Sequence, residues 1–343
     1  MKKGKIKKQM LWTLLLCCNS LLAQDSKLLL DKQGVCKVVD WGVYTHFDCG
    51  FTKTETGLNY KKLNSIVDET RKNPVLSELK GFDLMPTFFA QNCDVKVGYG
   101  IPSIIHFEFH TWSLYKKSGK EGRWDIEPPH WDIMVNDIRP FGNSTDYIVN
   151  RPRKEDCKPG FDFEKWKNAT IKMRELFHTP GKKIMLEPGI DVYGDDKIIF
   201  YNPARPDYWL PVTVDEAYAI WIDYYKNDPD EIASKISLQM LEAEYAGLSA
   251  ADKKAPAYFG GVASISQINP QKTDQQLVRA NPLYWNKQLS KGAVQLLCCV
   301  LPQTRSYITY DKEEALKVQG GSYHMYRFME SFDIKTLLPL IEK

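Results

Sequence analysis

Histidine and carboxylate side chains alternate with apolar residues in the stretch 104–112, and this spacing is suited to holding a metal ion. The polar members are His106, Glu108 and His110. Residues two apart on a strand lie about 6.8 Å from each other and can converge on one ion, whereas residues four apart lie roughly 13 Å apart. Glu108 could therefore chelate with either histidine, but His106 and His110 could not share a metal along a straight strand.

A third ligand would have to come from the second alternating run, 130–137, which offers His130 and Asp132. Imidazole nitrogen together with carboxylate oxygen suits zinc or another divalent first-row metal. Such an ion could activate water, with Glu108 as the candidate catalytic group. This is not the helical H-E-x-x-H motif, because Glu108 has a different offset and the alternation favours a strand. The alternative is the solvated face of an antiparallel sheet, where polar side chains are expected anyway.

Two strands must position these residues. Ile105, Phe107 and Phe109 alternate with the polar side chains at a period of two, which is the pattern of a strand with one buried face. The run 130–137 alternates in the same way, and a Gly- and Lys-rich connection, 116–122, separates the two runs. The pattern predicts a long antiparallel hairpin.

A second candidate site is aromatic. Tyr208 and Trp209 lie in the proline-punctuated segment 202–211, close to Asp and Arg residues. In an exported protein such rings could stack on a glycan or a peptide. Equally, the segment could clamp the preceding strands to the following helix, and the sequence leaves both alternatives open.

The N-terminus predicts export. Five lysines precede the short apolar run 10–18, and a small residue, Ala23, follows. This pattern indicates a signal peptide over residues 1–23, and the run is too short to span a membrane, as is every later one. Lipid anchoring at Cys18 is disfavoured, because Cys17 stands where Gly, Ala or Ser usually precedes a lipidated cysteine. We expect a periplasmic or secreted protein.

The charge balance argues against nucleic-acid binding. The chain holds 46 basic and 43 acidic residues, and without the five leader lysines 41 basic residues face 43 acidic ones. A chain so close to neutral does not favour nucleic acid or an anionic membrane surface as a partner. The sequence also lacks a phosphate-binding P-loop, a G-x-G-x-x-G loop after a strand and a G-x-S-x-G elbow.

Six cysteines follow the leader, an even number that predicts disulfides in an oxidising compartment. Four of them, all in the first half of the chain, could pair among themselves: Cys36, Cys49, Cys93 and Cys157. Cys298 and Cys299 are adjacent on a predicted buried strand and point to opposite faces of it. We expect these two to be core residues, because strand geometry opposes a bond between them.

The remaining pattern predicts an α+β fold in which antiparallel sheet hairpins pack with helices, and in which the C-terminal half is more helical. A helix is expected over 59–72, with Asn59 as its cap, and a second hairpin turns at 193–196. A capping box of Thr213 and Glu216 opens another helix. A further helix, reaching about Tyr245, is expected to carry an apolar core stripe of Ile232, Ile236, Met240, Leu241 and Tyr245.

A change of composition near 143–160 suggests a boundary between two regions. Residues 24–150 would form an α+β region built on the long hairpin, and residues 151–343 a mixed region with a helical middle. One continuous domain is the alternative.

Two functions fit the sequence. One is a noncatalytic exported binding or envelope-associated protein, and the other is a metal-dependent hydrolase using the His106, Glu108 and His110 strand face. Side chains that converge would favour the enzyme, whereas divergent side chains on a convex sheet would favour the binding protein.

Overall fold

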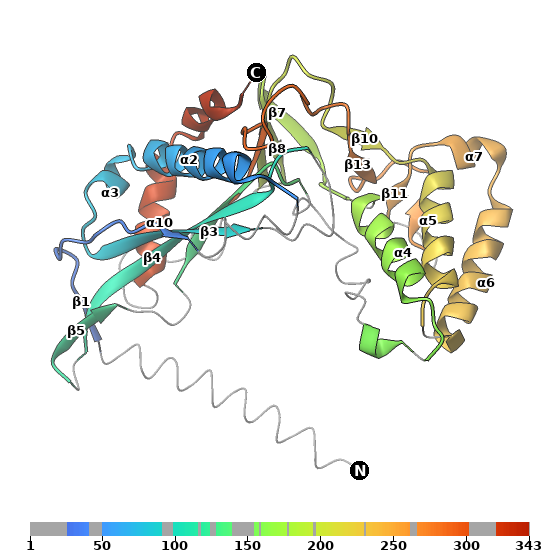
Figure 1. The fold of residues 1–343 in the computed structure, drawn as a ribbon, viewed down its shortest axis with the longest axis horizontal. Coiled ribbons are helices and arrows are strands. Elements are labelled where there is room, and N and C mark those ends of the chain that lie inside the picture. The colour runs from blue at the N-terminus through green and yellow to red at the C-terminus, as the bar shows by residue number, and fades with distance from the viewer. Residues whose placement is uncertain are drawn as a thin grey trace, which may run out of the picture.

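The structure is a computed structural model, and one large sheet with helices around it dominates the fold (Figure 1). The residues that it describes are 26–40, 50–90, 99–115, 118–123, 128–138, 154–157, 159–176, 178–194, 197–229, 231–260, 266–301 and 320–342. The fold is α+β with a mostly antiparallel sheet, and helices are more frequent after residue 210, as the sequence predicts. The leader, residues 1–23, lies outside the described residues.

The large sheet has ten strands. Eight of them follow one path, in the order β2 (Val39–Asp40), β3 (Phe82–Ala90), β4 (Ser103–Tyr115), β6 (His130–Val135), β14 (Leu296–Val300), β9 (Lys197–Tyr201), β8 (Ile190–Tyr193) and β7 (Lys183–Glu187). Two more strands pair with β4, namely β1 (Ser26–Leu28) and β5 (Lys120–Arg123). Every pairing is antiparallel except that of β2 with β3. The sheet thus takes strands from both of the predicted regions.

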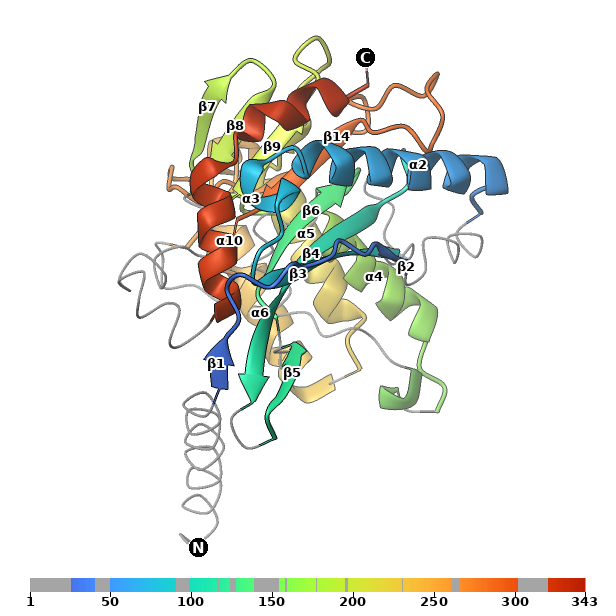
Figure 2. The same cartoon turned by 90° about the vertical axis from the view of Figure 1, so that its left-hand side faces the viewer.

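Helices cover one face of this sheet. They are α2 (Lys53–Thr70), α3 (Pro74–Ser77), α10 (Gly320–Ser331) and the 3₁₀ helix η3 (Ile334–Leu340). Figure 2 shows α2 and α10 lying across the strands. The core between them is fully buried and includes Ile66 from α2, Phe328 from α10, and Ile105 and Phe107 from β4. The apolar positions of the predicted alternation therefore face the helices.

A second group of helices packs on its own core, away from the helix-covered face (Figure 1). It consists of α4 (Phe163–Leu176), α5 (Val214–Lys226), α6 (Glu231–Gly247) and α7 (Ala250–Lys254). Two short ribbons lie in the same part of the chain, β10 (Trp209–Pro211) with β13 (Val278–Ala280), and β11 (Tyr258–Phe259) with β12 (Ile268–Asn269). A one-turn 3₁₀ helix, η2 (Lys154–Asp156), precedes α4. The capping box of Thr213 and Glu216 opens α5 as predicted.

The pairing of β4 with β6 is confirmed, but the connection between them is not a plain loop. After Tyr115 the chain first returns as β5, which pairs with the end of β4, and only then forms β6. The second predicted hairpin is also confirmed, as β8 and β9. Its turn residues Asp195 and Asp196 lie outside the described part of the chain.

Two details of the helices differ from the prediction. The first long helix begins at Lys53, because Thr52 and Glu55 form a capping box there, and Asn59 is instead buried within it, accepting a hydrogen bond from Ser103. On α6, Leu241 is buried, but Ile236 and Met240 are 57% and 49% exposed. The side chain of Ile232 lies outside the described part of the chain. The neighbouring helix covers only part of the apolar stripe.

No two cysteines within the described residues form a disulfide, and Cys49 and Cys93 lie outside them. Cys298 and Cys299 are free thiols with no exposed surface. Cys299 lies in the core under the helices, and Cys298 lies in the core of the opposite face. Burial raises the pKa of both thiols well above the usual value. They are core residues, as expected. Among the described helices, none is both long and apolar enough to cross a membrane.

Candidate metal site

The register of β4 against β6 brings four polar side chains to one face of the sheet. His106 lies opposite Asp132, and Glu108 lies opposite His130. Because successive side chains of a strand point to opposite faces, these residues lie on the face away from α2 and α10. The fully buried Phe107 and Trp131 hold the same stretch of backbone from the other side, with their rings stacked 5.2 Å apart.

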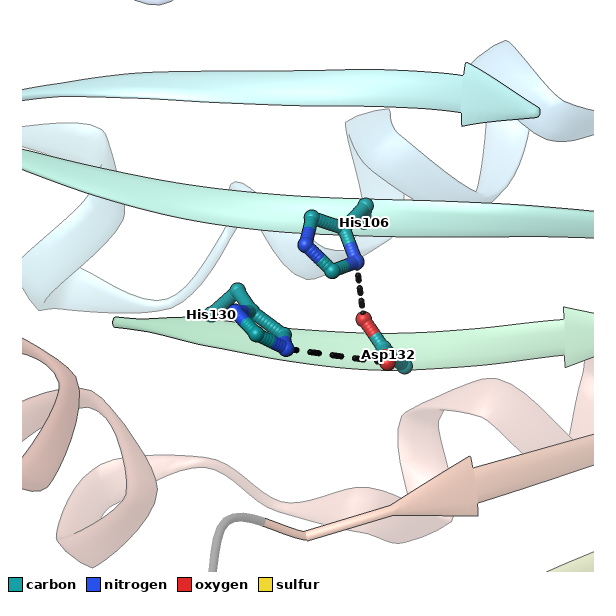
Figure 3. A group of neighbouring side chains, drawn as sticks. All are labelled: His106, His130 and Asp132. Atoms are coloured by element: carbon teal, nitrogen blue, oxygen red, sulfur yellow. Dashed lines mark ion pairs between the residues drawn. The ribbon is translucent and has the colours of Figure 1, made fainter. Parts of the chain in front are cut away.

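Three of these side chains converge (Figure 3). The Nδ1 atom of His106 lies 2.5 Å from Oδ1 of Asp132, and Nε2 of His130 lies 4.0 Å from Oδ2 of the same carboxylate. The two imidazole rings stack with centroids 3.9 Å apart. One ligand atom from each residue can be chosen so that all three lie within 4.8 Å of one another.

This donor set fits a divalent metal ion. Two imidazoles and one carboxylate around zinc, with bonds of about 2.0 Å, would place the ligand atoms roughly 3.3 Å apart in a tetrahedral site. Small side-chain rotations would therefore close the present arrangement around an ion.

The charges of the site also favour a cation. Burial of His106 opposes its charged form, but the contact with Asp132 and the negative charges of Asp132 and Glu108 outweigh burial and raise the pKa of His106. The cluster therefore attracts positive charge. The His130 side chain is 48% exposed, so the site is open to solvent on that side.

Glu108 and His110 form a separate pair beside the three converging residues. Oε2 of Glu108 lies 2.9 Å from Nε2 of His110, which is buried. Glu108 is opposite His130 in the register, so its carboxylate borders the cluster. The two histidines of β4 thus belong to different pairs, His106 with Asp132 and His110 with Glu108. The ring of Phe89 on β3 packs edge-on against His106, with centroids 5.8 Å apart.

The aromatic candidates Tyr208 and Trp209 are buried, at 4% and 8% exposed. The Tyr208 hydroxyl donates to the buried carboxylate of Asp191 and lies 2.8 Å from the hydroxyl of Tyr193. Burial raises the pKa of Tyr208 far above its usual value. These contacts correspond to the clamp alternative, because they tie the segment to β8. Ligand binding by the two residues stays a prediction.

A surface pocket of about 630 Å³ lies at the start of the segment 202–211, which carries Tyr208 and Trp209. Its walls are residues 202–206 and 283–286. The first wall belongs to the proline-punctuated segment that the sequence points to. Sequence reasoning missed the second wall, because residues 283–286 carry no motif. Tyr284 lines the pocket and also contacts Tyr208, with the two rings edge-on at a centroid distance of 6.2 Å.

Comparison of the chain with protein-family models, with curated proteins and with solved structures finds no match in any of the three.

Proposed function

We propose that the protein binds a divalent metal ion, zinc in the first instance, through His106, His130 and Asp132, and that it is a metal-dependent hydrolase. The observation that carries the proposal is the convergence of three ligand atoms from two paired strands to within 4.8 Å. Two imidazoles and one carboxylate leave a fourth position for water, as in catalytic zinc sites. Bound zinc lowers the pKa of such a water to about 7.

Glu108 is the residue that would accept the proton of the attacking water. Its place opposite His130 puts it at the border of the cluster, and His110, 2.9 Å away, holds its carboxylate in place. A carboxylate held by a second group and adjacent to the reacting water is the arrangement that general base catalysis requires. The exposure of His130 leaves a side open from which a substrate could approach.

The pocket favours a second candidate function, that of a noncatalytic binding or envelope-associated protein. Its lining combines Pro203, Pro206 and the 76% exposed Leu283 with Arg205 and two asparagines. Apolar surface with a few polar groups is typical of ligand pockets, and a glycan or a peptide is the expected ligand. The predicted leader supports export to the periplasm or the cell exterior for either function.

The test is the metal content of untagged protein after dialysis against zinc, measured by mass spectrometry and compared with that of variants. We expect about one equivalent of metal in the wild type. His130→Ala should lose metal affinity by at least tenfold to a hundredfold, since substitutions of residues that only hydrogen-bond to metal ligands already cost about that much. Glu108→Gln is the matched control on the same face. It should keep the metal, because it is not a ligand, but lose hydrolysis of ester and phosphoester substrates.

Wild-type protein that takes up no metal from excess zinc would contradict the site, as would a His130→Ala variant that binds metal equally well. Metal binding without any hydrolysis that depends on Glu108 would contradict the enzyme and leave a metal-binding protein. In that case glycan and peptide arrays, with and without a Leu283→Asp variant, test the pocket.

A further inference from the structure

The strand β7 forms one edge of the ten-stranded sheet. It pairs with β8 on one side, and none of the described strands pairs with its other side. Figure 2 shows β7 at the margin of the sheet, beside β8. An edge strand presents unpaired backbone N–H and C=O groups, which another strand can pair with.

The side chains of β7 are unusual for an exposed edge. Ile184, Met185 and Leu186 follow one another and are 55%, 62% and 51% exposed. Proteins usually protect such edges with charges or prolines, because an apolar edge invites association. A contiguous exposed apolar run, unlike a single exposed side chain, indicates an interaction site.

The charges at the two ends of β7 indicate the occupant. The strand reads Lys183-Ile-Met-Leu-Glu187. If two copies pair antiparallel about a twofold axis at Met185, Lys183 of each copy lies opposite Glu187 of the other, and Ile184 lies opposite Leu186. A parallel pairing in register would place like charges together, which is unfavourable. The strand is thus complementary to itself in the antiparallel sense, as the interface of a twofold dimer must be.

Two features limit the strength of this contact. The end charges already have partners within the chain, since Lys183 lies 3.2 Å from Asp191 and Glu187 lies 2.6 Å from Lys335. Both side chains nevertheless stay accessible, because Lys183 is 48% exposed and Glu187 is 30% exposed. The register of β7 on β8 also shifts between Met185 and Glu187, and such bulges interrupt regular pairing. A short contact of this kind favours a dimer that depends on concentration.

We propose that β7 is the docking strand for a second copy of this chain, joining two sheets into one continuous sheet across a twofold axis. The inference is independent of the metal site, because β7 lies at the opposite side of the sheet path from β4.

Sedimentation equilibrium of the purified protein over about 1 µM to 1 mM tests the proposal. We expect a reversible monomer–dimer equilibrium in the wild type. Met185→Lys places two like charges opposite each other at the axis and should raise the dissociation constant at least about tenfold. Ile236→Lys on α6, at a site that is 57% exposed, is the matched control and should leave the dimer unchanged.

A covalent test identifies the strand itself. Directly opposed side chains on antiparallel strands have Cβ atoms about 4.5–5.5 Å apart, so a Met185→Cys variant should form a disulfide-linked dimer on mild oxidation, and an Ile236→Cys variant should not. A wild type that stays monomeric at every concentration overturns the proposal. So does a dimer that survives Met185→Lys, or one that Ile236→Lys weakens equally.

Discussion

Acid should weaken the attachment of α10 to the sheet through one buried histidine, His324. Its side chain is 1% exposed and stacks on Phe82, with ring centroids 4.4 Å apart. Neither ring nitrogen has a hydrogen-bond partner among the described residues. Burial disfavours the charged imidazolium, and the nearby Arg327 adds repulsion, so the pKa of His324 falls from 6.5 to about 4. The folded state therefore favours the neutral ring.

The sign and size of the effect follow from the two pKa values. The unfolded chain protonates near pH 6.5 and the folded chain near pH 4, so the stability that depends on the neutral ring is fully present above pH 6.5 and is lost as the pH falls toward 4. Each pKa unit corresponds to about 1.4 kcal/mol. The free energy of unfolding should therefore fall by about 2 kcal/mol at pH 5 and about 3 kcal/mol at pH 4 from this residue alone.

Urea unfolding followed by tryptophan fluorescence, at about pH 7.5 and about pH 5, measures the effect. We expect the wild type to lose about 2 kcal/mol more between these two pH values than His324→Leu, which keeps apolar packing but cannot be protonated. Met325→Leu, a buried neighbour on the same helix that leaves His324 in place, should behave like the wild type. Equal losses in the wild type and His324→Leu would refute the reasoning.

Two further substitutions test how the helices are held. Thr213→Ala removes the side chain that accepts a hydrogen bond from the Glu216 amide, and should lower the free energy of unfolding by about 1 kcal/mol in urea titrations; no change would mean that α5 does not depend on its cap. Phe328→Ala removes a fully buried ring that packs against Phe109 and Trp131, and should cost about 3–5 kcal/mol in the same assay. A loss below about 1 kcal/mol would show that α10 is not a major part of the core.

The alternation at a period of two was enough to predict the faces of β4 and β6. Ile105 and Phe107 are fully buried, and His106 and Asp132 share the other face. The alternation could not decide which polar side chains meet, because that depends on the register between the strands, and a slip of one residue changes every partner. The connection between the two runs also contains β5, so its length did not set the register.

Burial on α6 and β7 depends on neighbours that are distant in the sequence. Ile236 and Met240 have the spacing of a core stripe, but the packing of α5 against α6 decides how much of the stripe is covered. The apolar run of β7 resembles that of a buried strand, but the strand lies last in the strand order and its three apolar side chains are exposed. The cap of α2, in contrast, could have been predicted from the sequence, because Thr52 and Glu55 already have the spacing of a capping box.

The position of β14 in the sheet has a consequence for the order in which the chain can fold. β14 lies between β6 and β9, and its partners are about 160 and about 100 residues earlier in the sequence. During synthesis, the edges of β6 and β9 that later pair with β14 therefore stay unpaired until residues near 300 have been made. Contacts between such distant segments slow folding, and the exposed edges favour aggregation until β14 pairs with them. The last seventh of the chain thus decides whether two separate sheets become one.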